Sequence, residues 1–86
     1  MPYIKESQRG RLDVLINPLI NKLTTAHEGE VNYTITRIID GIYGQGGYAV
    51  FNRAMGVLEC VRQEFYRRRI APYEDQKKEE NGEVYL

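Results

Sequence analysis

Three segments of the chain carry apolar residues at helical spacing, and this periodicity constrains the fold more than any other feature of the sequence. The segments are residues 6–24, 30–43 and 48–70. Their apolar positions recur every three or four residues, as on one face of a helix: Leu12, Leu15, Ile16, Leu19, Ile20 and Leu23; Val31, Ile35, Ile38, Ile39 and Ile42; Phe51, Ala54, Met55, Leu58, Val61 and Phe65. The sequence therefore predicts an all-α fold, a small bundle of three main helices in which the first two pack along the third.

Two prolines mark the expected interruptions. Pro18 removes an amide donor inside the first segment, so we expect that helix to be kinked or to split in two, with Asn17 capping the second piece. A residue before proline avoids helical dihedral angles, so Ala71 before Pro72 predicts an end or a kink of the third helix. Residues 1–71 then form the helical bundle, and residues 72–86 form an acidic extension that belongs to the same domain.

Length and composition exclude several classes of protein. A chain of 86 residues makes one domain, and no apolar run approaches the roughly 18 residues that a membrane span needs. We expect a cytoplasmic protein with no membrane partner. Cys60 is the single cysteine and His27 the single histidine, which excludes an internal disulfide and a Cys/His zinc site. A domain this small has a thin stability margin, so we expect a homo-oligomer.

A longer part of the sequence resembles a known family. The resemblance runs from Gly56 to Arg69, continues through 71–75, and includes 80–85 and the segment Asn32-Tyr33-Thr34-Ile35-Thr36. It is similar to a small domain family of unknown function from bacterial and phage genomes. The resemblance implies a bacterial cell, with phage infection as a setting, and implies that the segment from Pro72 to Tyr85 belongs to the domain. It implies no activity, ligand or functional residue.

The charges are distributed unevenly, although the net charge is zero. Residues 1–70 hold ten Lys and Arg against seven Asp and Glu, whereas residues 71–86 hold two against five. The densest positive charge is Arg67-Arg68-Arg69. These arginines either pair with nearby carboxylates and the negative end of the helix, or bind an anionic ligand. Tight DNA binding is not expected, because such proteins usually carry a strongly basic face.

An anionic, nucleotide-like ligand would need guanidinium groups beside aromatic rings. Tyrosines make up seven of the nine aromatic residues, and a phenol suits an interface or a stacked ligand. The glycine-rich loop 44–47 precedes the third helix and is either an ordinary connection or an anion-binding helix start. The predicted ligand-binding residues are Tyr48, Arg53, Arg62, Tyr66 and Arg69.

Catalysis is not expected, with or without a metal or other cofactor. Glu59 and Glu64 are five positions apart and therefore on different helical faces, and the paired carboxylates of helical nucleotide pyrophosphatases are absent. Cys60 is expected to be a half-buried, inert thiol. The sequence thus predicts a non-enzymatic binding module for an anionic ligand. A structural or adaptor protein that binds another protein is the alternative, and a nucleotide hydrolase ranks last.

Overall fold

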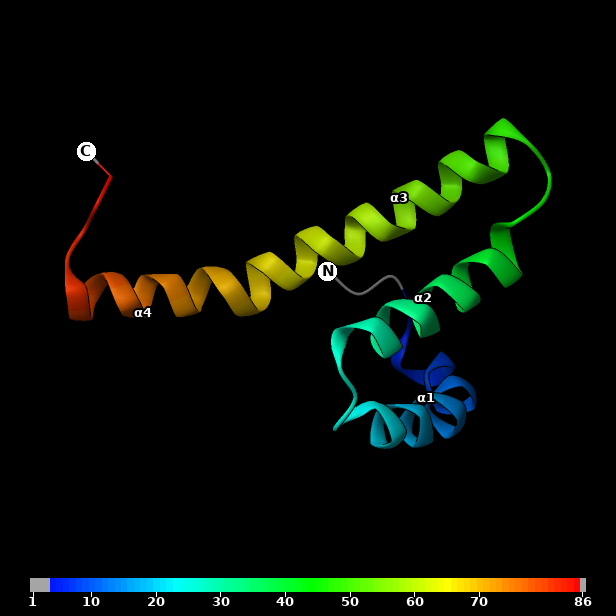
Figure 1. Cartoon of the computed structure of the whole chain (residues 1–86), viewed down its shortest axis with the longest axis horizontal. Helices are drawn as coiled ribbons and strands as arrows, with labels where there is room; N and C mark the ends of the chain where they lie inside the picture. The colour runs from blue at the N-terminus through cyan, green and yellow to red at the C-terminus, as the bar shows by residue number, and fades with distance from the viewer. Residues whose placement is uncertain (1–3, 86) are drawn as a thin grey trace. The chain divides into compact units, whose positions relative to one another are not determined.

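A computed structural model describes residues 4–85, and these residues form helices joined by short loops with no strand (Figure 1). The all-α prediction is confirmed. The chain divides into two units, Met1–Gln45 and Gly46–Leu86. The first holds the short 3₁₀ helix η1 (Glu6–Gln8), α1 (Gly10–Leu23) and α2 (Glu28–Tyr43). The second holds α3 (Tyr48–Phe65), the π-helical turn η2 (Tyr66–Ile70) and α4 (Ala71–Asn81).

In the first unit, α1 contains Pro18 without being split. The prediction of two separate helices is therefore wrong, and a kink at this proline stays a prediction. Pro18 lacks one amide donor, but the other intrahelical hydrogen bonds of the 14-residue α1 are enough for the helix to continue past it. Beyond the end of α1, the Thr24 hydroxyl donates to the Ile20 carbonyl at 2.9 Å, which satisfies one of the acceptors of the last turn.

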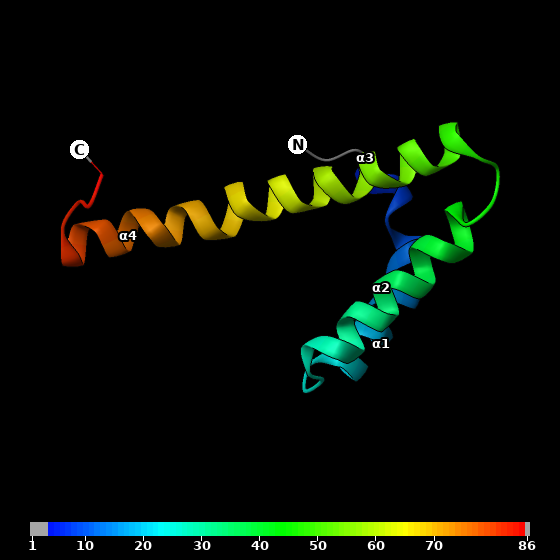
Figure 2. The same ribbon diagram turned by 45° about the horizontal axis from the view of Figure 1, so that its top comes forward.

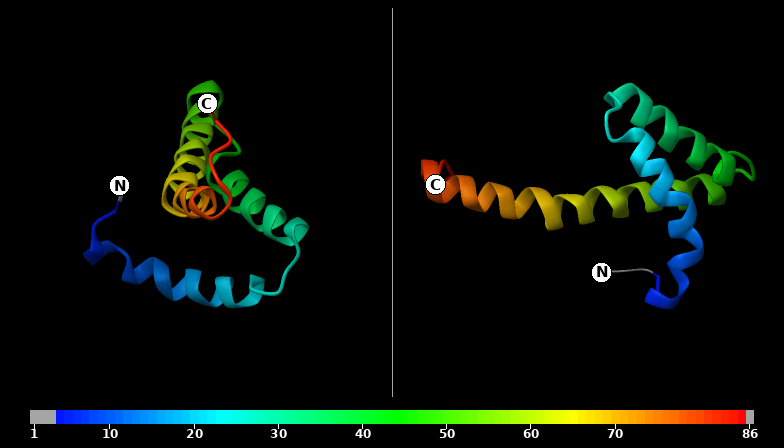
Figure 3. Two further views of the ribbon diagram at one scale, coloured as in Figure 1. Left: turned by 90° about the vertical axis from the view of Figure 1, so that its left-hand side faces the viewer. Right: turned by 90° about the horizontal axis from the view of Figure 1, so that it is seen from below.

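The start of α2 depends on His27. Its Nδ1 accepts a hydrogen bond from the Gly29 amide at 3.1 Å, so the imidazole caps the helix. The helix consequently begins at Glu28, two residues before the predicted start. From this loop α1 and α2 diverge (Figure 3), which leaves their apolar stripes largely uncovered within the unit.

Two residues of the glycine-rich loop, directly before α3, have positive φ. Gly46 has a φ of 118° and Gly47 a φ of 84°, both in a region that side-chain-bearing residues rarely adopt. A Cβ at Gly46 would also lie 2.6 Å from Cγ2 of Val50. These glycines therefore have a structural role at the start of α3, as an ordinary helix connection requires.

In the second unit α3, η2 and α4 form one uninterrupted helical segment from Tyr48 to Asn81, which Figure 2 shows from another side. The predicted end at Pro72 is thus wrong. Ala71 keeps helical angles, with φ −59° and ψ −46°, although it precedes proline. Its amide bonds to the Tyr66 carbonyl, five residues back. This wider turn separates the Pro72 ring from the Arg68 carbonyl, with which it would clash in a regular α-helix.

Very little of the described chain is buried. Ala54 is the one buried residue among 4–85, and the large apolar side chains of all three stripes are half-buried or exposed. The predicted packing of the first two helices along the third stays a prediction, as does the assignment of residues 72–86 as an extension of a single domain.

Candidate functional site

The five predicted ligand-binding residues all lie in the helical segment of the second unit. Tyr48 begins α3, Arg53 and Arg62 follow within it, and Tyr66 and Arg69 belong to η2. Tyr48 and Arg69 are separated by 21 positions, or roughly 31 Å at about 1.5 Å per residue. One small ligand cannot contact both of them on the same chain. Arg62 and Tyr66 are one helical turn apart, but Arg62 contacts Glu59 and Tyr66 interacts with Glu74, so the two side chains have different partners.

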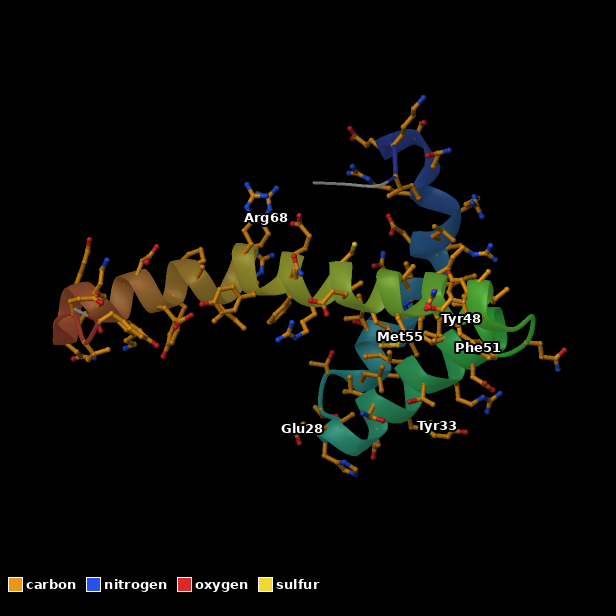
Figure 4. The ribbon with its side chains drawn as sticks, turned by 90° about the horizontal axis from the view of Figure 1, so that it is seen from above. Glu28, Tyr33, Tyr48, Phe51, Met55 and Arg68 are labelled. Atoms are coloured by element: carbon orange, nitrogen blue, oxygen red, sulfur yellow. The ribbon has the colours of Figure 1, made fainter. Side chains whose placement is uncertain are left out.

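The π-helical turn changes the direction of the arginines that follow Tyr66. In a regular α-helix Arg62 and Arg69 are seven positions apart and share a face. In η2 each residue turns through a smaller angle, because hydrogen bonds reach back five residues instead of four. Arg69 is therefore rotated away from the line that runs through Arg62. Figure 4 shows the side chain of Arg68 on the opposite side of the segment from Phe51 and Met55.

Three of the arginines are in ion pairs with nearby carboxylates. Arg62 Nη1 lies 3.1 Å from Glu59 Oε1, and Arg67 and Arg68 lie 4.0 and 3.6 Å from the carboxylate of Glu64. The arginine side chains of these pairs are mostly exposed, so each pair contributes little to stability.

Arg53 and Arg69 differ from these three arginines. Within residues 4–85 neither of them forms an ion pair or a hydrogen bond through its side chain. Both guanidinium groups are exposed. They are the two predicted ligand-binding arginines whose charge is not offset by a neighbouring carboxylate in the described chain.

Two groups near these arginines have shifted pKa values. The Gln63 side-chain amide donates to Glu59 Oε1 at 2.9 Å, and together with the positive charge of Arg62 it lowers the pKa of the Glu59 carboxyl below 4.5. The Tyr66 phenol donates to the Glu74 carboxylate, and this hydrogen bond and negative charge raise the pKa of Tyr66 above 10.0. Tyr66 therefore stays protonated, and it faces carboxylates of α4.

A cavity that the sequence did not predict lies beside Tyr66, between α4 and the segment 82–85. Its volume is about 430 Å³. Gly82 has a φ of 90° and ends α4, and an ion pair of 3.9 Å between Lys78 and Glu83 ties the following residues to the helix. The side chains that bear charge or an aromatic ring in its lining are Tyr66, Tyr73, Glu74, Asp75, Lys77, Lys78, Glu83 and Tyr85.

The signals for this cavity were present in the sequence, but only in separate places. Tyr66 and Tyr73 are seven positions apart, and Asn81-Gly82 is a turn signal. The acidic composition of the C-terminal segment predicts an extension, whereas the structure places residues 82–85 against α4 of the same unit. Lys77 lies over the Tyr73 ring at 5.6 Å and 3.1 Å from Glu80, so one cation of the chain already contacts this aromatic lining.

The residues considered for catalysis are not brought together. Glu59 and Glu64 each interact with arginines, and Cys60 is exposed, so the expectation of a half-buried thiol is wrong. Cys60 lies on the side of α3 away from the apolar positions, which leaves the thiol in solvent. Residues 4–85 contain no cluster of three His, Cys, Asp or Glu side chains that could hold a metal ion. None of their helices is long and apolar enough to cross a membrane.

In the second unit, the apolar face of α3 is left uncovered. Phe51, Met55 and Phe65 are 48%, 65% and 59% exposed, and Val61 is also exposed. Figure 4 shows Phe51 and Met55 projecting from the same side of α3. We call the row Tyr48, Phe51, Met55, Leu58, Arg62 and Phe65 the α3 seam, because its members alternate at spacings of three and four within α3.

Residues 4–85 therefore define a small all-helical protein with an uncovered apolar face on α3. The match to protein families agrees with the resemblance noted above. The chain belongs to a family described as a domain of unknown function (DUF6899), whose model matches residues 1–84. The predicted membership in a small family of unknown function is thereby confirmed. No curated protein and no solved structure matches the chain.

Proposed function

We propose that the protein is a non-enzymatic helical module that acts by assembly, and that its apolar helix faces bind protein chains, with a second copy of itself as the first partner. The observation that carries the proposal is the exposure of the α3 seam. Phe51, Met55 and Phe65 each leave about half or more of their surface in solvent. Large side chains of this kind stabilise a folded protein mainly by leaving water.

The scarcity of buried residues supports the same proposal. A 60-residue domain normally buries about 60% of the surface of its unfolded chain, and a longer chain buries more. Here Ala54 is the one buried residue in the described part of the chain. Tyr48, which is 82% exposed, and Tyr66 extend the apolar face with phenols, a residue type enriched at interfaces.

The predicted three-helix bundle offers another way to cover these faces. In that arrangement the stripes of α1 and α2 would pack on the α3 seam within one chain, and the predicted homo-oligomer would form through other surfaces. Assembly through the seam predicts instead that a charge placed on the seam separates the copies. Size-exclusion chromatography with light scattering measures the oligomeric state.

A pair of matched variants tests the role of the seam. Phe51→Glu places a charge on the seam, so we expect it to convert the oligomer to a monomer. Asn52→Glu adds the same charge at the neighbouring exposed position, about 100° round the helix, and should leave the assembly unchanged. A wild-type protein that is monomeric at all concentrations, or variants that behave alike, would refute the proposal.

Binding of an anionic, nucleotide-like ligand is a second candidate, favoured by two arginines. Arg53 and Arg69 are exposed and have no carboxylate partner in the described chain. A thermal-shift panel of mono-, di- and cyclic nucleotides tests this candidate, because a ligand present at 100 times its dissociation constant adds about 2.7 kcal/mol to stability. Arg69→Ala should remove the shift, whereas Arg67→Ala, which removes an arginine already paired with Glu64, should retain most of it. In phage infection such a protein would sequester the nucleotide.

A further inference from the structure

We propose that a second copy of the chain packs antiparallel on the α3 seam, with Leu58 at the twofold axis of the pair. The inference rests on the proposed function and specifies its partner and register. It starts from the spacing of the seam, which is symmetric about its centre: Phe51 and Phe65 lie seven positions before and after Leu58. In an antiparallel pair, Phe51 of each copy therefore lies opposite Phe65 of the other.

The distribution of charge favours an antiparallel over a parallel arrangement of the two copies. A parallel pair would place Arg62 opposite Arg62, and the Arg67-Arg68-Arg69 run beside its own copy. Like charges at such distances repel, and parallel helix dipoles add to the repulsion. In the antiparallel pair Arg62 lies opposite Met55 of the second copy. The guanidinium of Arg62 already pairs with Glu59 at 3.1 Å, so its methylene stem can cover the methionine while the charge stays compensated.

The exposed area fits an interface between two copies. Phe51 and Phe65 offer about 200 Å² each, and roughly half of that is exposed, which leaves about 200 Å² of aromatic surface per copy. Met55 and Val61, which are 65% and 62% exposed, add further apolar surface. A stable interface buries about 800 Å² per partner. The flanking Tyr48 and the stem of Arg62, both largely exposed, supply much of the remainder.

This register also accounts for the separation of the predicted ligand-binding residues. Tyr48 and Arg69 are roughly 31 Å apart on one chain, which is too far for one small ligand. They are nearly equidistant from Leu58, ten positions before it and eleven after it. In the antiparallel pair Tyr48 of one copy therefore lies at nearly the same level along the helix axes as Arg69 of the other. Each end of the pair then presents a phenol and a guanidinium from two different chains.

Engineered cysteines in the full chain test the register. In a Cys60→Ser background, Leu58→Cys should form an intermolecular disulfide under mild oxidation, because residues at the axis of the pair meet each other. The double variant Phe51→Cys with Phe65→Cys should also be linked between chains. Disulfides require Cα atoms within about 7 Å, so each link reports close approach. The unmodified chain is the control, since the exposed Cys60 lies off the seam and should not be linked.

The outcomes separate this inference from the proposed function. A monomer by light scattering refutes both. An oligomer in which Phe51→Cys alone is linked to itself has parallel helices, and it refutes the register while leaving assembly intact. An oligomer in which the unmodified Cys60 is linked and Leu58→Cys is not uses another face of α3, and it also refutes the register. Linkage of Leu58→Cys and of the double variant, without linkage of Phe51→Cys alone, supports it.

Discussion

Arg62 Nη1 lies 3.1 Å from Glu59 Oε1, and the same oxygen accepts a hydrogen bond of 2.9 Å from the Gln63 amide. One carboxylate thus holds two consecutive side chains of α3. The sequence predicted Arg62 as a ligand-binding residue, and the structure shows it in an ion pair with a neighbour in the same helix. Arg62 can still cover apolar surface with its stem, because the ion pair engages only the guanidinium.

The Glu59 carboxyl should titrate below its ordinary value of 4.5, because the Gln63 hydrogen bond and the Arg62 charge favour its ionised form. A carboxyl whose pKa is lowered in the folded state stabilises the fold above its unfolded pKa, and this contribution is lost as the pH falls through the folded value. We expect Gln63→Ala and Arg62→Ala each to raise the pKa of Glu59. Side-chain ¹³C NMR over a pH titration measures it, and an unchanged midpoint in both variants would contradict the assignment.

Two glycines of the second unit should respond in opposite ways to alanine. Gly46→Ala should destabilise the protein by about 1 kcal/mol or more, since its φ of 118° is strained for alanine and the new Cβ would lie 2.6 Å from Val50 Cγ2. Gly56→Ala should stabilise it by about 0.5–1 kcal/mol, because Gly56 lies inside α3 and an added Cβ there would meet open space. Thermal unfolding compares the two, and a gain from Gly46→Ala would overturn the structural role given to that loop.

The imidazole of His27 should be replaceable by asparagine but not by alanine. Its Nδ1 caps α2 through the Gly29 amide at 3.1 Å, and the loss of an N-cap costs typically about 1 kcal/mol. We therefore expect His27→Ala to lower the unfolding temperature and to speed hydrogen exchange in the first turn of α2, while His27→Asn stays near wild type. Equal effects of the two substitutions would show that the cap does not stabilise the helix.

The helices could be predicted from the sequence, whereas the π-turn and the cavity could not. Apolar residues such as Leu12, Ile35 and Phe51 recur at a period that only a helix satisfies, so the existence of all three main helical segments followed from local pattern. The π-turn includes a hydrogen bond from the Ala71 amide to the Tyr66 carbonyl, and Pro72 alone indicated an end or a kink of the helix without indicating which hydrogen bonds would change.

In the candidate site, too, the sequence predicted what depends on nearby residues and missed what depends on residues far apart in the chain. Spacing alone placed Arg62 and Tyr66 on neighbouring turns, and the structure has them there. The cavity beside Tyr66 depends on how residues 82–85 return to α4 after Gly82, which is a contact between distant positions. The exposure of Cys60 was also missed, although its helical position, on the side of α3 away from the apolar residues, could have indicated it.

Pro72 should be the cause of the π-turn, and its replacement provides the last test. Pro72→Ala restores an amide that can donate to the Arg68 carbonyl and removes the ring that would clash with it in a regular helix. We expect residues 66–70 to revert to α-helical hydrogen bonding, with Arg69 turning back toward the line of Arg62. Amide hydrogen exchange and through-bond NMR couplings across residues 62–73 report the change. The same pattern as wild type would mean that the π-turn is held by other contacts, such as the hydrogen bond from Tyr66 to Glu74, and Tyr66→Phe in the Pro72→Ala background would then release it.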